Sequence, residues 1–294
     1  AARKGWVMIQ VVVVKWGERY SAAHVNNTFN EIRTLCSRDV KCVCVTDDED
    51  GLAEFIEAKG VPDWGDWYET LKKGCRLKLS IFEPGLLDPD LPTLFFDLDT
   101  MILGDVAELV KELEKTGGMY MSRGHFLPLW RILGTVRKLV KNYYYYGNSP
   151  MLAFYPRDFE GLVADFKREF EYVRWRGITH KWPLDRICKT DERFISYFAR
   201  GRVRVFPQHL AVKFTTEYMT SFVDFSSTVS RLPWVQKRRK SQVALTFSGH
   251  VLKPSLVKDI KDGTKVASRH YRMTWNFPQF SAYWARMEVP QEDV

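Results

Sequence analysis

The sequence predicts one α/β domain, in which a mainly parallel central sheet is flanked by helices and followed by a decorated C-terminal half. Residues 7–14 and 40–45 are apolar runs rich in valine, and a helical pattern lies between them. Such runs are typical of strands buried on both faces of a parallel sheet. Strand, helix and strand within the first 46 residues form a βαβ unit. No repeat or linker interrupts the 294 residues, which indicates a single domain.

The first helical pattern begins after Ser21, a favourable N-cap residue, and continues to Leu35. A second helical stretch, 68–82, precedes the apolar run that ends at Phe96. Beyond that run the pattern predicts helices from Asp105 and over 127–146, 157–170 and 184–199, and strands at 119–121, 151–155, 203–206 and 243–247. The second half therefore continues the alternation of strands and helices.

The composition is that of a globular protein, with 45% hydrophobic and 14% aromatic residues. No apolar run approaches the roughly 18 residues that a membrane-spanning helix needs. The formal net charge of +8 suits an anionic partner: a nucleotide, a nucleic acid or an acidic membrane face. The densest basic cluster is 237–240, beside Trp234, for which we predict a solvated loop, with peripheral membrane contact as the alternative.

The cysteines form no C-x-x-C pair, and their number is odd: Cys36, Cys42, Cys44, Cys75 and Cys188. Cys42 and Cys44 alternate within the second apolar run, so their side chains should point the same way. This usage favours core thiols in a reducing compartment over a zinc site or a disulfide framework. We therefore expect a cytoplasmic protein.

The run 94–96 ends abruptly in two carboxylates, Asp97 and Asp99. Alternate residues of a strand share a face, so both side chains could converge at the sheet edge where ligands of such folds gather. Two oxygen ligands with open positions for phosphate oxygens suit Mg²⁺ or Mn²⁺. The alternative is a simple acidic turn, since aspartate is common in turns.

Other nucleotide and acyl-transfer motifs are absent: the sequence has no G-x-G-x-x-G, no G-x-x-x-x-G-K-[ST] and no G-x-S-x-G. A nucleotide-sugar transferase and a haloacid dehalogenase-type aspartyl phosphatase both fit the D-x-D motif. The phosphatase motif usually lies on the first strand and has Thr or Val where this chain has Met101. A basic nucleic-acid or membrane-surface module is a third alternative, but no nucleic-acid motif supports a nucleic-acid partner.

Residues 7 to about 255 resemble the GT-A glycosyltransferases of family 8 type. The matching segments are V-V-V-V-K-W-G-E-R-Y, C-V-T-D-D, R-L-K-L-S-I-F and L-F-F-D-L-D-T-M-I-L-G-D, with shorter matches at 148–149, 184–186 and 253–254. The resemblance implies a GT-A type fold over 1–294, with a nucleotide-binding half (7–105), an acceptor and sugar half (106–260) and a C-terminal extension (261–294). It also implies transfer of a hexosyl or pentosyl group from a nucleotide sugar, UDP-linked, to a glycan, a glycolipid or another hydroxyl acceptor.

The resemblance also implies a role for each matched position. Mn²⁺ or Mg²⁺ would be held by Asp97, Asp99 and His250, and the diphosphate would be met by Lys253. The sugar and acceptor would lie between Asn148 and Asp185. The nucleotide would be bound by Val13, Val14, Tyr20, Thr46, Asp47 and Lys78.

Two departures from the family pattern remain open. The family commonly has Asp-Gln where this chain has Asp185-Arg186, and its late histidine usually precedes a glycine, whereas here Gly249 precedes His250. A lone histidine near a strand end is often only hydrogen-bonded, so His250 is either a third ligand or a structural residue. Asp185 is either a carboxylate of the site or a helix N-cap.

Overall fold

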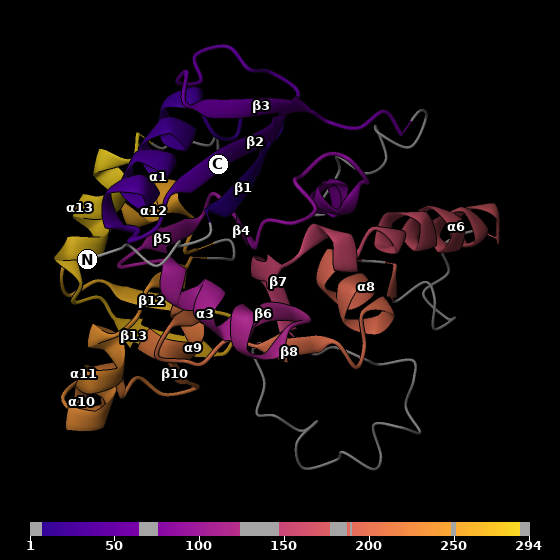
Figure 1. Ribbon diagram of the computed structural model, residues 1–294. Coiled ribbons are helices and arrows are strands. Elements are labelled where there is room, and N and C mark those ends of the chain that lie inside the picture. The colour runs from indigo at the N-terminus through magenta and orange to yellow at the C-terminus, as the bar shows by residue number, and fades with distance from the viewer. Residues whose placement is uncertain are drawn as a thin grey trace.

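The computed structural model describes residues 8–64, 76–123, 147–176, 187–188, 190–247 and 251–288. Within these ranges the largest sheet has seven strands in the order β3-β2-β1-β4-β7-β6-β8 (Figure 1). Adjacent strands from β3 to β4 are parallel, as are β6 and β8, whereas β7 is antiparallel to both of its neighbours. This confirms the predicted, mainly parallel sheet. Its strands are β1 (Ile9–Lys15), β2 (Val40–Thr46), β3 (Ile56–Gly60), β4 (Thr93–Phe96), β6 (Met119–Arg123), β7 (Gly147–Phe154) and β8 (Val203–Val205).

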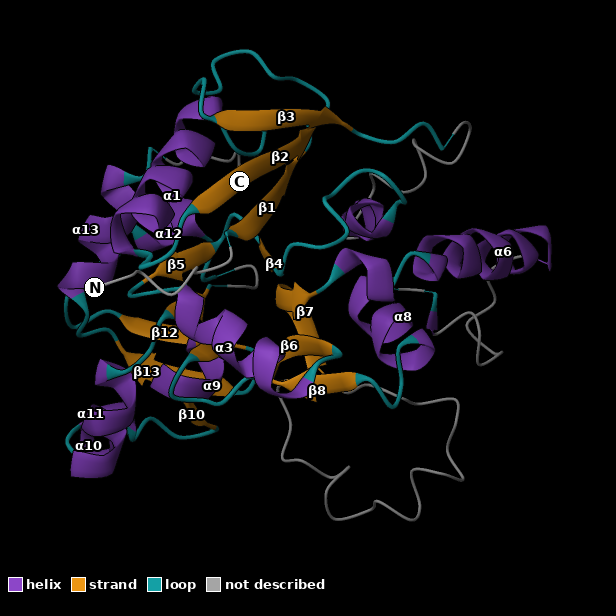
Figure 2. Cartoon of the chain, in the orientation of Figure 1, coloured by secondary structure: helices purple, strands orange, loops and turns teal. Residues whose placement is uncertain are grey.

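Helices cover both faces of this sheet (Figure 2). Val11 and Val13 of β1 pack in one core cluster with residues of α1 (Ala22–Leu35) and α3 (Ala107–Thr116). Val12 and Val14, which alternate with them, pack in a second cluster with residues of α6 (Gly161–Arg176) and α8 (Asp191–Phe198). Burial on both sides explains why β1 is an unbroken apolar run.

A third core cluster lies beneath two small sheets, ordered β5-β11-β9 and β10-β13-β12. Its largest fully buried side chains are Trp275 and Trp284. These sheets comprise β5 (Thr100–Ile102), β9 (Ala211–Lys213), β10 (Thr220–Ser221), β11 (Ala244–Thr246), β12 (Lys265–Ser268) and β13 (Tyr271–Thr274). The accompanying helices are α9 (Phe214–Tyr218), α10 (Ser226–Ser230), α11 (Pro233–Lys240), α12 (Pro254–Val257) and α13 (Pro278–Arg286).

Several predicted elements are confirmed and others are corrected. Ser21 caps α1 through its Oγ, which accepts from the His24 backbone N–H at 3.1 Å. The strand expected at 151–155 begins at Gly147, and the helix expected from 157 begins at Gly161 after the 3₁₀ helix η4 (Pro156–Asp158). The basic cluster 237–240 is helical rather than a loop, because Pro233 starts a helix at its first turn. The strand at 243–247 is not the last, since the β12–β13 hairpin follows it.

Other expectations concern residues that are only partly described. Of the stretch 68–82, residues 76–82 form the 3₁₀ helix η2 (Arg76–Phe82), and the remainder lies outside the described ranges. The helix expected over 127–146 also lies outside them. Of the helix expected over 184–199, residues 187–188 and 190–199 are described, and α8 begins at Asp191. The predicted division at 105 and 260 stays a prediction.

Cys42 and Cys44 are buried free thiols in the same core cluster, as predicted. Burial raises the pKa of Cys42 to about 11 and that of Cys44 to about 12, so both are protonated at neutral pH. None of the helices in the described ranges is both long and apolar enough to cross a bilayer.

The buried His24 ties the N-terminal helix to two distant segments. Its ring nitrogens lie 2.8 Å from the Leu98 carbonyl oxygen and 3.0 Å from that of Met287. Burial lowers the pKa of His24, against the effect of both carbonyl oxygens. Leu98 lies between Asp97 and Asp99, and we call residues 97–99 the acidic turn. The His24 ring therefore braces the acidic turn against the end of α13.

Candidate active site

The acidic turn is fixed by backbone hydrogen bonds from three neighbouring segments. The Asp97 N–H donates to the Pro150 carbonyl at 2.8 Å, and the Thr100 N–H donates to the Asp97 carbonyl at 3.0 Å. The Phe247 N–H donates to the Asp99 carbonyl at 2.8 Å. The two aspartates therefore lie where β4, β5, β7 and β11 meet, at the carboxyl edge of β4.

Negative charge on this turn is costly. Withdrawal from water, followed by repulsion from Asp97, raises the pKa of Asp99 to about 7. Withdrawal from water also raises the pKa of Asp97, although the Lys78 ammonium opposes the rise. Asp99 Oδ1 is buried and has no hydrogen-bond partner within the described ranges. A cation beside this oxygen would relieve both the repulsion and the missing contact.

Lys78 is held between two carboxylates. Its Nζ lies 2.5 Å from Asp97 Oδ2 and 3.7 Å from Asp191 Oδ2, and its side chain is 11% exposed. Asp191 is completely buried, and its Oδ2 also accepts a short hydrogen bond from Ser149 Oγ. The 3₁₀ helix η2, the strand β7 and the helix α8 thus meet at one ammonium group.

Two further charged residues extend this cluster. Burial, together with the neighbouring Asp191, raises the pKa of Glu192 to about 7. Lys213, at the end of β9, is 6% exposed; burial lowers its pKa, whereas Glu192 and Asp99 raise it. The sequence alone did not identify Asp191, Glu192 or Lys213 as residues of the site. The available signal for the two acids was their place in the first turn of α8, where negative charge is favourable.

Of the residues predicted to bind the nucleotide, Lys78 lies in η2 against Asp97, whereas the others lie in β1 and β2 or follow their ends. The Gly17 N–H donates to both carboxylate oxygens of Asp47, at 3.0 and 3.2 Å, and Lys15 Nζ donates to the Asp48 carbonyl at 3.2 Å. Thr46 Oγ1 donates to the same carbonyl at 2.8 Å. These contacts join the two strand ends into one rim.

Other predicted nucleotide contacts differ in exposure. Val13 and Val14 pack in opposite core clusters, so only their backbone can line a pocket. Tyr20 is half-buried, with its ring centroid 4.9 Å from that of His24.

The remaining predicted residues are brought close only in part. Asn148 is buried in β7, and its side-chain amide donates to the Arg123 carbonyl at 3.2 Å. Lys253 is half-buried at the start of α12. Asp185 and His250 lie outside the described ranges.

The donor set fits a divalent cation in part. Asp97 and Asp99 offer hard oxygen ligands, and the unpartnered Oδ1 of Asp99 is available to an ion. Within the described ranges no group of three or more His, Cys, Asp or Glu side chains could complete a metal site. Further ligands would have to come from a bound diphosphate, from water or from the region around His250.

Comparison with known proteins shows the fold. No family model and no curated protein sequence matches the chain significantly. It is similar to the galactosyltransferase LgtC, solved in complex with donor and acceptor sugar analogues (TM-score 0.58, 14% identity, 96% of this chain, 98% of LgtC). It is also similar to the bifunctional glycosyltransferase WbbM (0.54, 12%, 99% of this chain, 51% of WbbM) and to the glycosyltransferase GlyE of Streptococcus pneumoniae (0.54, 11%, 96% of this chain, 62% of GlyE).

The chain therefore has the GT-A glycosyltransferase fold, as the resemblance implied. This fold is not that of the phosphatase alternative. Its assignment to family 8 stays a prediction.

Proposed function

We propose that this protein transfers a sugar from a nucleotide-sugar donor, UDP-linked, to a hydroxyl of a glycan or glycolipid, with Mn²⁺ or Mg²⁺ at Asp97 and Asp99. The observation that carries the proposal is the carboxylate pair at the carboxyl edge of β4, in which Asp99 Oδ1 is buried without a hydrogen-bond partner in the described ranges. The fold supports it, because the similar solved structures are named as glycosyltransferases and LgtC was solved with donor and acceptor sugar analogues. The Asp97 and Asp99 carboxylates would be the protein ligands, with the third position assigned to His250.

Transfer breaks the bond between the anomeric carbon and the diphosphate oxygen and forms a bond from that carbon to the acceptor oxygen. Negative charge grows on the leaving diphosphate and positive charge on the sugar. When bound, the divalent cation neutralises the leaving group. Lys253 would place a second positive charge against the same diphosphate.

The sugar side of the site is assigned to Asn148, Asp185, Asp191 and Glu192. Carboxylates near the anomeric carbon stabilise its developing positive charge. Transfer with retention of the anomeric configuration requires no dedicated base. Transfer with inversion requires a base to take the acceptor proton, and the candidates are Asp185 and Glu192, whose pKa is about 7.

A screen of nucleotide sugars for Mn²⁺-dependent release of the nucleoside diphosphate tests the proposal. We expect at least one donor to be hydrolysed slowly without an acceptor and faster with one. An aspartyl phosphatase would instead release inorganic phosphate from phosphomonoesters. A chain that binds none of the donors by calorimetry, with or without Mn²⁺, is not this enzyme.

We expect Lys253→Ala to lower turnover by roughly 10-fold to 100-fold, because the ammonium meets charge that grows in the transition state. Affinity for the nucleoside diphosphate should fall as well, which calorimetry measures. Lys261→Ala removes an exposed lysine of the same region and should change neither quantity. Equal losses in both variants would mean that Lys253 acts only through the overall charge.

We expect His250→Ala to raise the Mn²⁺ concentration for half-maximal activity by roughly tenfold, because one nitrogen ligand is lost. Saturating Mn²⁺ should restore much of the rate, since both carboxylates remain. His209→Ala, at an exposed histidine, is the matched control. Metal dependence equal to that of the parent would remove His250 from the metal site.

Peripheral membrane contact through Lys237–Lys240, the alternative predicted from the sequence, is separate from sugar transfer. Such contact requires exposed cationic side chains, and Lys237 and Lys240 are exposed.

A further inference from the structure

Four large apolar side chains are exposed within one short segment. Of the nine that are exposed in the described ranges, Phe222 (78% exposed), Val223 (55%), Phe225 (58%) and Trp234 (63%) lie within 13 residues. Single exposed apolar residues are ordinary on a protein surface, but a group of this kind marks an interaction site. We call residues 222–225 the apolar turn.

The conformation of the apolar turn is fixed by hydrogen bonds. Thr220 Oγ1 donates to the Val223 carbonyl at 2.7 Å and accepts from the Phe225 N–H at 2.9 Å. Asp224 accepts from the Ser226 N–H at 3.0 Å and from Thr274 Oγ1 at 2.7 Å. The fold therefore presents these apolar side chains to solvent on a fixed support.

The backbone of Phe222 adopts a strained conformation, which also indicates that its side chain is held in place. Its φ of +63° lies in the left-handed region, which bulky side chains rarely adopt. The Phe222 N–H donates to the His270 carbonyl at 2.6 Å, which holds the residue in place. Strain retained at an exposed position indicates a use for the side chain it presents.

The segments beside the apolar turn are strongly basic. Residues 220–240 and 265–274 contain eight Lys and Arg against one Asp. The pairing of β10 with β13 joins the two segments, and both lie at one corner of the molecule with α10 and α11 (Figure 1). Asp224, the single acid among them, is engaged by Ser226 and Thr274.

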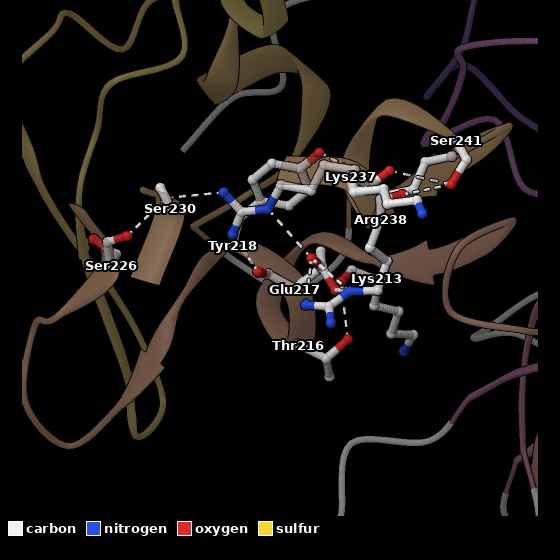
Figure 3. A network of polar contacts seen from close by, with 11 residues as sticks. Lys213, Thr216, Glu217, Tyr218, Ser226, Ser230, Lys237, Arg238 and Ser241 are labelled. Carbon is white, nitrogen blue, oxygen red and sulfur yellow. Dashed lines mark hydrogen bonds and ion pairs between the residues drawn. The ribbon is translucent and has the colours of Figure 1, made fainter. Parts of the chain in front are cut away.

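The basic cluster of α11 divides into an inward and an outward pair. Glu217, 1% exposed in its side chain, accepts from Arg238 Nη2 at 2.9 Å and from Arg239 Nε at 3.2 Å (Figure 3). Arg239 also donates to Ser230 Oγ at 2.8 Å. These two arginines attach α11 to the domain, whereas Lys237 and Lys240 are exposed.

We propose that the apolar turn and Trp234, with exposed cations around them, bind the surface of an anionic lipid bilayer. The cations are Arg231, Lys237, Lys240 and Arg269. Aromatic and aliphatic side chains enter the headgroup boundary, while lysine and arginine pair with anionic headgroups. A nucleic acid would use the charge but not the apolar side chains. This binding does not depend on the sugar-transfer activity.

Vesicle flotation measures the binding directly, with phosphatidylcholine alone and with about 30% phosphatidylglycerol added to supply surface charge. We expect binding only to the anionic vesicles, and weaker binding at about 1 M salt because screening shortens the range of the attraction. Replacing Phe222, Val223 and Phe225 together by serine should weaken binding at least about tenfold. The matched control replaces Met8, Tyr172 and Leu256, which are also exposed, and should bind like the parent.

The charge contribution is tested separately. Lys237→Gln with Lys240→Gln should weaken binding about fivefold per charge. Lys115→Gln with Lys261→Gln removes the same charge from exposed sites elsewhere and should have a smaller effect. Phe222→Gly is a control for loss of binding through misfolding. Glycine tolerates the φ of this residue, so the thermal stability of the variant should equal or exceed that of the parent while its vesicle binding falls.

Three results would overturn the proposal: no binding to anionic vesicles, equal binding by the serine variant, or a dimer in sedimentation velocity that the serine variant abolishes. The last would assign the surface to a second copy of this chain. Asp97→Asn should bind vesicles like the parent, so a failure of the transferase proposal is seen separately.

Discussion

Asp99→Asn is expected to reduce sugar transfer by roughly 1,000-fold while the protein stays folded. The amide offers a cation a weaker oxygen ligand and no negative charge, and transfer depends on neutralising the leaving diphosphate. Calorimetry with Mn²⁺ and nucleoside diphosphate should show a matching loss of metal affinity. Full activity at limiting Mn²⁺ would disprove the metal site.

Asp105→Asn is the matched control for this prediction. Asp105 belongs to the same sequence motif, but its Oδ1 accepts from the backbone N–H groups of Ser37 and Ala107, both at 3.0 Å. Its replacement should lower stability and leave the metal dependence of the rate unchanged. Metal binding is thereby separated from the general effect of removing an acid.

The pH dependence of stability gives an independent test of Asp99. Its pKa is about 7 in the folded protein and about 4 in the unfolded chain, so the folded state binds more protons between these values. The metal-free protein should therefore lose stability as pH rises from about 4 to about 7. Asp99→Asn should flatten this decline in urea unfolding, and Mn²⁺ should oppose it in the parent.

Lys78→Met is expected to cost about 3 kcal/mol in the free energy of unfolding, because it leaves the buried Asp191 carboxylate and the largely buried Asp97 carboxylate without their shared ammonium. Activity should fall as well, since the repulsion would displace both carboxylates. Urea unfolding at neutral pH measures the loss, and Lys78→Arg, which keeps the charge, should recover much of it.

Two responses distinguish this charge effect from a packing defect. Acid should narrow the stability gap between Lys78→Met and the parent, because protonation removes the repulsion. Mn²⁺ should stabilise the variant more than the parent by restoring a positive charge beside Asp97. A variant that unfolds like the parent at every pH would show that the ammonium is not needed there.

The elements that could be predicted are those whose signal is local. The run of valines in β1, the Ser21 cap of α1 and the apolar run of β4 are each complete within a few residues. The strand β3 was not predicted, because Ile56 is the only one of its five residues that is buried. In the hairpin β12–β13, buried residues alternate with exposed ones in β12 and with half-buried ones in β13, over four positions in each strand. A pattern this short does not stand out in the sequence.

The acidic turn was visible in the sequence because its two carboxylates are only two residues apart, but the side chains around them were not visible. Lys78, Asp191 and Lys213 come from three elements and meet only after folding. No periodicity links residues so far apart along the chain. Their roles therefore required the tertiary structure.

The brace on the acidic turn also has a consequence for the order in which the chain folds. His24 contacts Met287, and the Tyr283 hydroxyl accepts from the Ile102 N–H at 3.2 Å, so segments separated by 263 and 181 residues stabilise one turn. Contacts of such long sequence separation form late, after the local sheet and helices. During synthesis, the nascent βαβ unit would therefore emerge with the acidic turn unbraced, and only the arrival of α13 would complete it.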